Sequence, residues 1–319
     1  MPGTDIAEAI TVVLGEFPDL PHLPELPDRG PGAEIIGRGA GLLVDMPVEL
    51  YAARWRLAAR PGRDLRRTLD LMERDLDTLT ERADGYSGVF KIQVTGPWTL
   101  AAGVELPLGG RVLRDLGACR DLTASLAEGV AAHVAEVAAR LPQARILLQV
   151  DEPSLPAVLA GDIPTESGLG RLPAIEASVA GQALKEVIDA AGVPVVAHCC
   201  APGAPIGLFR EVGATAVSVD LELVRTADTA TWDVLGEVLD AGMGLFAGAI
   251  PTTGQIRPEA ARQAAERTTE LWRQLGLPIE RLAQQVVLTP ACGLATVTPQ
   301  QARAALTACR EGARRLFPE

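Results

Sequence analysis

The chain has 319 residues, of which 48% are hydrophobic and 22% are charged, and this balance excludes an intrinsically disordered protein. The net charge of −12 disfavours binding to the phosphate backbone of a nucleic acid. No apolar run reaches the ~18 residues of a membrane-spanning helix, and the first residues lack the basic and apolar regions of a secretory signal, so we expect a cytoplasmic protein.

Short runs rich in β-branched residues alternate with longer amphipathic stretches along the chain. Each short run is typical of a buried strand, and each long stretch is typical of a helix that covers a sheet. This order predicts a parallel sheet with helical crossovers. The predicted strands are 88–94, 145–151, 193–198, 215–220, 244–250 and 285–289, and the predicted helices are 64–84, 111–141, 181–191, 230–241, 258–275 and 299–317.

Two further segments complete the predicted architecture. Residues 41–45 (GLLVD) are predicted to form a seventh strand, and the proline-rich residues 18–31 are predicted to form a loop or a surface wrap over the barrel end. A second proline-rich stretch, residues 153–173, directly follows a strand and is interpreted as a long loop, so no linker divides residues 1–319. Seven or eight parallel strands fit a single-domain α/β protein with a (β/α)8 TIM barrel better than an open doubly wound sheet, because neither a G-x-G-x-x-G motif nor a P-loop is present.

Metal-ligating residue types fall at the carboxyl ends of the predicted strands, where TIM barrels build their active sites. His198, Cys199 and Cys200 end one strand, Asp220 ends the next, and Cys292 follows the last. Side chains alternate along a strand, so His198 and Cys200 share a face while Cys199 points away. Two thiolates, one imidazole and one carboxylate are ligands that suit Zn²⁺. The sequence therefore predicts a zinc site of His198, Cys200, Cys292 and a carboxylate such as Asp220.

The cysteines also allow a simpler interpretation. Five cysteines without regular spacing do not form a disulfide framework, and a single cysteine at a strand end is more often a small buried hydrophobe than a ligand. The convergence of ligands from three strand ends favours zinc over this interpretation. Cys119 and Cys309 lie inside predicted helices, and for them we expect core packing.

Five short motifs of the sequence follow one another in a characteristic order. With these motifs, the sequence from roughly residue 40 to its end resembles the catalytic C-terminal barrel of cobalamin-independent methionine synthase, in which they occur in the same order. The likeness is to the short, single-barrel branch, within the superfamily that includes uroporphyrinogen decarboxylase-like barrels. The motifs are Thr95-Gly96-Pro97, Asp151-Glu152-Pro153, His198-x-Cys200, Val217-Ser218-Val219-Asp220 and Pro290-Ala291-Cys292-Gly293-Leu294.

The resemblance implies a metal-ligand set. In the family, one His, two Cys and one Glu hold the zinc, which implies that His198, Cys200 and Cys292 are ligands here. The family's Glu falls on Asp220, whose side chain is one methylene shorter. Glu222, two residues further on and with the same strand parity, is the alternative carboxylate.

Departures from the family pattern shape the expected function. The family's opening strand should end about where this chain begins, at Met1, so the first strand is expected to be missing or truncated, or the true start to lie upstream. Folate-using members place a His after the strand that corresponds to 244–250, as the acid for the leaving folate nitrogen. Pro251 stands at that position and cannot donate a proton. The N-terminal half of the long enzymes, which contributes to folate binding, has no counterpart here, so we do not expect methyltetrahydrofolate to be the donor.

These observations together predict a zinc-dependent methyltransferase that makes methionine from homocysteine. The resemblance implies that Asp151 binds the amino group of homocysteine, and a carboxylate is the charge complement of an ammonium. The expected donor is methylcobalamin, free or carried by a corrinoid protein, because its cobalt leaves without a proton. Two alternatives stay open: methyl transfer to another thiol such as coenzyme M, and a degenerate barrel that binds zinc or a thiol without turnover.

Overall fold

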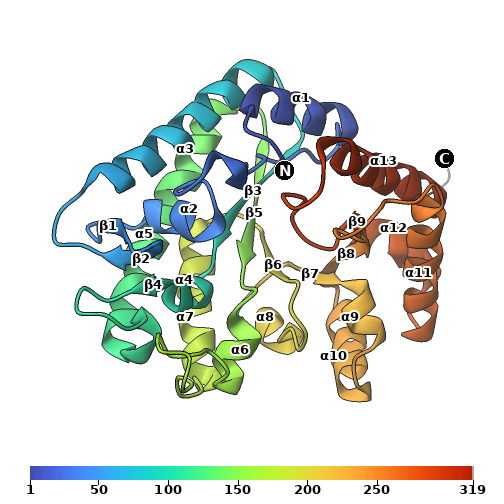
Figure 1. Ribbon diagram of the computed structural model, residues 1–319. Coiled ribbons are helices and arrows are strands. Elements are labelled where there is room, and N and C mark those ends of the chain that lie inside the picture. The colour runs from blue at the N-terminus through green and yellow to red at the C-terminus, as the bar shows by residue number, and fades with distance from the viewer. Residues whose placement is uncertain (318–319) are drawn as a thin grey trace.

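A six-stranded parallel sheet forms the centre of the molecule and curls into a partial barrel in the computed structural model, which describes residues 1–317 (Figure 1). The strands lie in the sheet in the order of the chain, and each of the six predicted strands is confirmed to within two residues. The strands are β3 (Val89–Thr95), β5 (Arg145–Asp151), β6 (Val195–Cys199), β7 (Ala216–Asp220), β8 (Gly244–Ile250) and β9 (Val286–Pro290).

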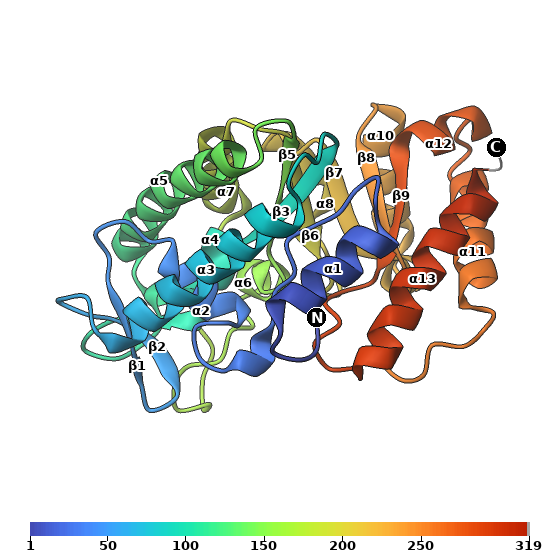
Figure 2. The ribbon, with the colours of Figure 1, turned by 90° about the horizontal axis from the view of Figure 1, so that it is seen from above.

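Helices cover the outside of this sheet, so the predicted α/β alternation is confirmed. The helices are α1 (Ile6–Glu16), α2 (Ile35–Gly41), α3 (Arg63–Arg82), α4 (Pro97–Gly103), α5 (Leu116–Arg140), α6 (Leu155–Ala160), α7 (Ala177–Ala191), α8 (Ile206–Glu211), α9 (Leu221–Arg225), α10 (Thr229–Asp240), α11 (Ala260–Gln274), α12 (Leu282–Gln285) and α13 (Pro299–Leu316), with short 3-10 turns at Pro27–Arg29, Val112–Arg114 and Ile279–Arg281. In Figure 2, α3, α5 and α7 flank one side of the sheet, and α11 and α13 flank the other. Within residues 1–317, no helix is long and apolar enough to cross a membrane.

The two faces of the strands differ in polarity. On β3, Phe90, Ile92 and Val94 are buried, whereas Lys91 and Gln93 alternate with them and are partly accessible. The alternating side chains therefore place an apolar face under the helices and a polar face inside the curl. At the amino ends of the strands the inside is filled by a small apolar cluster, made of Leu20, Leu147, Val196, Ala216, Phe246 and Val287.

The predicted strand at residues 41–45 is wrong, because this segment ends α2 and turns. The backbone N–H groups of Leu42 and Leu43 donate to Gly39 and Ala40, so they are not available for a ladder. The carbonyl of Val44 accepts a hydrogen bond from Ser125 of α5 at 2.7 Å. The chain then forms a separate small sheet of β1 (Val48–Tyr51), β2 (Arg54–Leu57) and β4 (Val104–Glu105).

The proline-rich residues 18–31 form the predicted loop, apart from a 3-10 turn at Pro27–Arg29, but part of the segment lies along the edge of the sheet instead of over the barrel end. Lys91 of β3 donates its N–H to Pro21 at 2.9 Å, and its carbonyl accepts from Leu23 at 3.0 Å. This is a single parallel bridge between His22 and Lys91, and Leu23 is buried. The prolines lack the N–H groups that a longer ladder requires, so the segment stands beside β3 as a truncated first strand.

No strand ladder joins β9 to residues 21–23 within the described part of the chain, and the barrel is closed on this side by helices. Helix α1 packs against α13, where Arg310 pairs with Glu16 at 3.1 Å and Thr307 donates to the same carboxylate at 3.2 Å. The fold is thus a TIM-barrel-like half-barrel that lacks one full strand.

Candidate metal centre

Three of the predicted ligands come together at the carboxyl ends of β6 and β9. His198 is on β6, Cys200 follows it, and Cys292 follows β9. The imidazole nitrogen and the two sulfur atoms all lie within 4.8 Å of one another. The Sγ atoms of Cys200 and Cys292 are 3.1 Å apart although the residues are 92 positions apart in the sequence.

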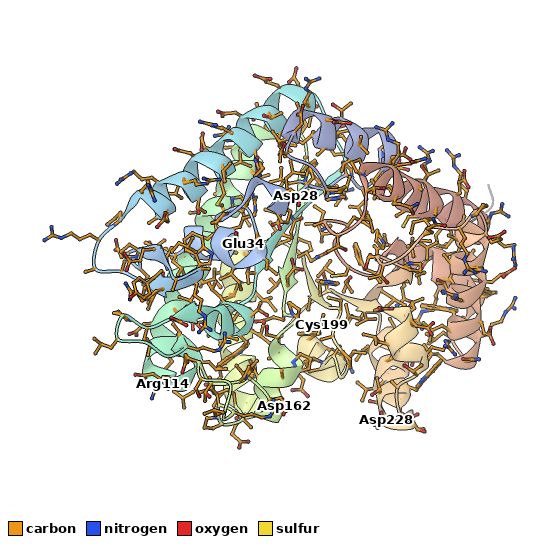
Figure 3. All side chains as sticks on the ribbon, viewed as in Figure 1. Asp28, Glu34, Arg114, Asp162, Cys199 and Asp228 are labelled. Carbon is orange, nitrogen blue, oxygen red and sulfur yellow. The ribbon has the colours of Figure 1, made fainter. Side chains whose placement is uncertain are left out.

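Strand parity decides which cysteine of the pair at 199 and 200 reaches this cluster. Cys199, which is labelled in Figure 3, ends β6 and is buried. The alternation of side chains along the strand places it on the face opposite to His198. Burial raises the pKa of the Cys199 thiol to about 11, so it stays protonated. Cys119 and Cys309 are buried among apolar side chains, which confirms the predicted core packing of both.

The absence of a side chain at Gly248 allows the segment with Cys292 to approach. Gly248 of β8 pairs with Asp220 of β7 and lies close to the backbone that follows β9. A Cβ atom at Gly248 would stand 2.7 Å from the Ala291 Cα and 2.7 Å from the Val219 carbonyl oxygen. Any larger residue would therefore push the adjacent Cys292 away from His198.

Ser218 fixes the orientation of the His198 ring, and sequence reasoning assigned it no role. The two residues are register partners on β6 and β7, and Nδ1 of His198 lies 2.9 Å from the Ser218 hydroxyl. This contact occupies Nδ1 and leaves Nε2 for a metal, which is the usual arrangement of a metal-binding imidazole. The signal was available, because Ser218 has the same strand parity as Asp220.

The three side chains influence one another's ionisation. Hydrogen bonds from Cys200 and His198 lower the pKa of the Cys292 thiol to about 4. The same contact raises the pKa of Cys200, so the pair holds one proton between its sulfur atoms. Burial lowers the pKa of His198, but Cys292 and Asp151 outweigh this and the net direction is upward. The cluster therefore supplies one thiolate, a second thiol and an imidazole, which are groups that a metal ion can bind in place of their protons.

Neither candidate carboxylate is in this cluster. Asp220 accepts a hydrogen bond from the N–H of Glu222 at 2.8 Å and caps α9. The Glu222 carboxylate is exposed and pairs with Arg225 at 2.5 Å, and this contact holds its pKa below the usual range. The structure thus brings together His198, Cys200 and Cys292, and leaves Asp220 and Glu222 in local contacts on α9.

The two neighbouring carboxylates of the D-E-P motif, Asp151 and Glu152, lie on opposite faces of the sheet and have different partners. Asp151 ends β5 inside the curl as the register partner of His198, and burial raises its pKa to about 6. Glu152 points the other way and is fully buried, where it accepts from the N–H groups of Trp98 and Thr99 at 2.9 and 2.8 Å. Burial raises the pKa of Glu152 to about 7. Its role in anchoring α4 was not apparent from the sequence.

The end of β8 carries no acidic proton donor of its own. Pro251 is exposed and follows Ile250, the last residue of the strand. The proline lacks an N–H group and has no titratable side chain. Pro251 itself therefore cannot serve as a general acid.

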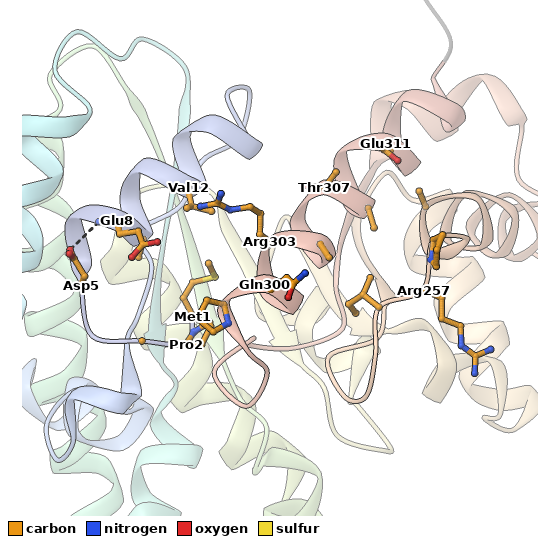
Figure 4. Close-up of a pocket in the computed structure, with 18 of the residues that line it drawn as sticks. Met1, Pro2, Asp5, Glu8, Val12, Arg257, Gln300, Arg303, Thr307 and Glu311 are labelled. Atoms are coloured by element: carbon orange, nitrogen blue, oxygen red, sulfur yellow. Dashed lines mark hydrogen bonds between the residues drawn. The ribbon is translucent and has the colours of Figure 1, made fainter.

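A cavity of about 900 Å³ lies away from the sulfur atoms, between α1 and α13 (Figure 4). Met1, Val12, Arg257, Arg303 and Thr307 are among the side chains that line it. The described lining residues include no cysteine and no histidine. We place the chemistry at the cluster of His198 and the two thiols because that is where metal-binding atoms converge.

Comparison with known sequences identifies the family. Residues 29–315 match the family described as "Cobalamin-independent synthase, Catalytic domain". The chain belongs to this family. It is accordingly a methyltransferase of the methionine synthase type, as the resemblance implied. No curated protein matches the chain closely enough to count as a relative.

A solved structure supports the barrel-like fold. The chain is similar to a B12-independent methionine synthase from Shewanella sp. W3-18-1 in complex with selenomethionine, at 12% identity and a TM-score of 0.60 over 97% of this chain and 87% of that chain. A putative dihydrodipicolinate synthetase from Pseudomonas aeruginosa matches at 14% identity and a TM-score of 0.39, over 99% of this chain and 75% of that chain.

Family membership also bears on the expected methyl donor. The family is defined as cobalamin-independent, so it lends no support to the methylcobalamin donor or the corrinoid protein partner that the sequence led us to expect. The expectation depended on Pro251 and on the lack of a counterpart to the folate-binding N-terminal half of the long enzymes. Family membership supports methyl transfer and zinc chemistry, but it does not support methylcobalamin as the donor.

Proposed function

We propose that this methyltransferase transfers a methyl group to the thiol of homocysteine and forms methionine at a zinc site. The observation that carries the proposal is the convergence of His198, Cys200 and Cys292, whose ligand atoms lie within 4.8 Å of one another in a methionine synthase-type catalytic domain. Asp220 is the proposed fourth ligand, because it follows Ser218 by two residues on the same face of β7. To bind the metal it would exchange its hydrogen bond with Glu222.

The donor atoms fit zinc. Zinc–sulfur bonds of ~2.3 Å and zinc–nitrogen bonds of ~2.0 Å in a tetrahedron separate the ligand atoms by about 3.5 to 3.8 Å. The separations here, from 3.1 Å between the sulfur atoms up to 4.8 Å, bracket that range. When bound, zinc would deprotonate the acceptor thiol so that it reacts as a thiolate at neutral pH. His198 is held for this role by Ser218.

Asp151 is the proposed contact for the amino group of homocysteine. Its carboxylate lies inside the curl, beside His198, and Gln149 donates to one of its oxygen atoms at 2.7 Å. The ionised form is complementary to an ammonium group, and a partly buried site strengthens such a contact. Coenzyme M has no ammonium, so Asp151 favours an amino-acid acceptor.

Two observations constrain the methyl donor. Membership of a cobalamin-independent family favours a donor other than a corrinoid. Pro251 provides no proton at the end of β8, which favours a donor whose leaving group departs unprotonated. We propose a donor whose leaving group departs without a proton. Methylcobalamin is one such compound, although membership of the family does not favour it. Methyltetrahydrofolate is expected to react slowly, because well-placed general acid catalysis contributes roughly 10²- to 10⁴-fold.

The test is methionine formation by the zinc-loaded enzyme. Homocysteine and coenzyme M are each combined with methylcobalamin and with methyltetrahydrofolate, and the methylated thiol is measured by mass spectrometry. We expect zinc-dependent methylation of homocysteine. Methylation of coenzyme M alone would overturn the acceptor, and rapid folate-dependent turnover would overturn the donor. Stoichiometric zinc without turnover on any combination would identify a degenerate barrel instead.

A further inference from the structure

A lysine points into the barrel beneath the proposed acceptor site. Lys91 is on β3, and its Nζ lies 3.1 Å from Oε1 of Gln149 and 3.5 Å from Oε1 of Gln93. The chain contains only two lysines, Lys91 and Lys185, so the cation placed here is an exception in an arginine-rich protein. A compact ammonium with three donors can serve two amide oxygens at once.

The chemistry of the partners fixes the orientation of both glutamine amides. An ammonium group can only donate, so each amide must turn its oxygen toward Lys91 and its NH₂ group away. Both NH₂ groups then meet groups that can only accept. Nε2 of Gln149 donates to Oδ1 of Asp151 at 2.7 Å, and Nε2 of Gln93 donates to the Leu23 carbonyl at 2.9 Å. Lys91 and Asp151 thus hold opposite ends of the Gln149 amide.

Lys91 makes this contact without an ion pair of its own. No carboxylate within residues 1–317 lies within 4.0 Å of its ammonium, although Asp151 and Glu25 attract it from a distance. His22 is its partner across the β3 edge, and burial lowers the pKa of Lys91. Burying a cation with only neutral partners is unfavourable, which sets this lysine apart from the protein's paired arginines.

We propose that Lys91 is a positioning residue that, through Gln149, holds Asp151 ready for the ammonium group of an amino-acid thiol. One oxygen of Asp151 is occupied by Gln149, and the other is left for the acceptor. Without the lysine, the Gln149 amide loses the contact that holds its oxygen, and the side chain is free to move away from Asp151. Asp151 then loses the hydrogen bond that fixes its orientation toward the acceptor. The inference rests on the proposed function, since it assumes that Asp151 binds the acceptor.

The test compares two acceptors that differ only in the amino group, homocysteine and 4-mercaptobutyrate. Their dissociation constants are measured by calorimetry on zinc-loaded enzyme without a methyl donor. Lys91→Met is expected to weaken homocysteine binding by about 10- to 100-fold, the range for a hydrogen bond to a charged group, and to leave 4-mercaptobutyrate binding within about twofold. Gln149→Met, which keeps the lysine, should produce the same selective loss. Lys185→Met, at an exposed lysine, is the matched control and should change neither constant.

Asp151→Asn separates the failure of this inference from the failure of the proposed function. If Asp151→Asn removes the preference for homocysteine and Lys91→Met does not reduce it, the positioning role is overturned and the acceptor site stands. If Asp151→Asn has no effect on the preference, the ammonium site itself is wrong. In the double variant Lys91→Met/Asp151→Asn we expect no loss beyond that of Asp151→Asn, and additive losses would overturn the inference.

Discussion

Two clusters of ionisable side chains differ in how completely their members are paired: one is largely buried, and the other reaches the surface at Cys292. In the ionic cluster, made of Glu25, Arg29, Arg38 and Asp75, the fully buried Asp75 receives hydrogen bonds from Arg29 at 2.6 and 2.8 Å and from Arg38 at 2.8 Å. Arg38 also pairs with Glu25 at 3.1 Å. In the sulfur cluster at the strand ends, the thiols bond to each other and to His198.

The difference separates a structural device from a candidate site. The ionic cluster fastens the segment before α2 to α3, and its charges satisfy one another without a ligand. The sulfur cluster gathers three metal-ligand atoms, one of them on a thiol whose pKa is lowered to about 4, at a place where parallel strands end. Buried opposite charges that pair with one another therefore indicate a structural role. Thiols and an imidazole that meet at a strand end without such charge partners indicate a binding site.

The largest effect is expected in the ionic cluster. Asp75→Ala leaves the buried guanidinium groups of Arg29 and Arg38 without their carboxylate, and removing one partner of a buried ion pair costs about 3–5 kcal/mol of unfolding free energy. Urea denaturation measures this loss. Glu266→Ala, which breaks an exposed pair with Arg262, is the control and should cost less than about 1 kcal/mol. Loss of zinc from folded Asp75→Ala protein would contradict the separation of the two clusters.

The sulfur cluster is tested by its two neighbouring cysteines. Cys200→Ala is expected to weaken zinc binding by more than the ~100-fold that loss of a supporting contact can cause, with little change in stability of the metal-free protein. Cys199→Ala removes the adjacent thiol that points into the core, and should keep one zinc per chain. Elemental analysis after dialysis against a chelator measures both. Full zinc in Cys200→Ala would exclude this cluster as the metal site.

A smaller effect is expected from the residue behind His198. Ser218→Ala removes the contact at Nδ1 and should weaken zinc affinity by about 10- to 100-fold while all proposed ligands remain. Competition with a chromophoric chelator measures the affinity. Ser125→Ala, a serine of α5 that bonds to Val44, serves as the control and should bind zinc like the parent. Equal affinities for the two variants would mean that the imidazole is oriented by other contacts.

The smallest effect concerns pH and the ionic cluster's neighbour, His133. Burial, with Arg38 nearby, lowers the pKa of His133 to about 4 in the folded protein, against about 6.5 when unfolded. The unfolded chain therefore takes up a proton that the folded one does not, and stability falls as the pH drops below 6.5. At pH 5.5 this amounts to about 1.4 kcal/mol relative to pH 7.5. Between pH 7.5 and pH 5.5, the unfolding free energy of His133→Gln, measured by urea titration, should therefore fall by about 1.4 kcal/mol less than that of the parent. A loss equal to that of the parent would contradict the shift.

Much of the sheet could be predicted because its signal is local. Six runs of β-branched residues became six strands, and parity along β6 was enough to separate Cys200 from Cys199. What the sequence missed depends on contacts between distant residues. Residues 41–45 have the composition of a strand, but their N–H groups and carbonyls are used by α2 and α5. The proline-rich segment is a loop as predicted, but its one bridge to β3 was not apparent.

The sequence by itself determined the order of strands and helices, the ligand types at the strand ends, and the family to which these motifs point. These depend on residue spacing, which the chain carries in one dimension. Only the tertiary structure decided which polar groups meet across strands: Ser218 with His198, Lys91 with Gln149 and Asp151, and Glu152 with the start of α4. Such contacts depend on strand register and on the curl of the sheet. Both are fixed by packing between residues far apart in the sequence, which no local pattern encodes.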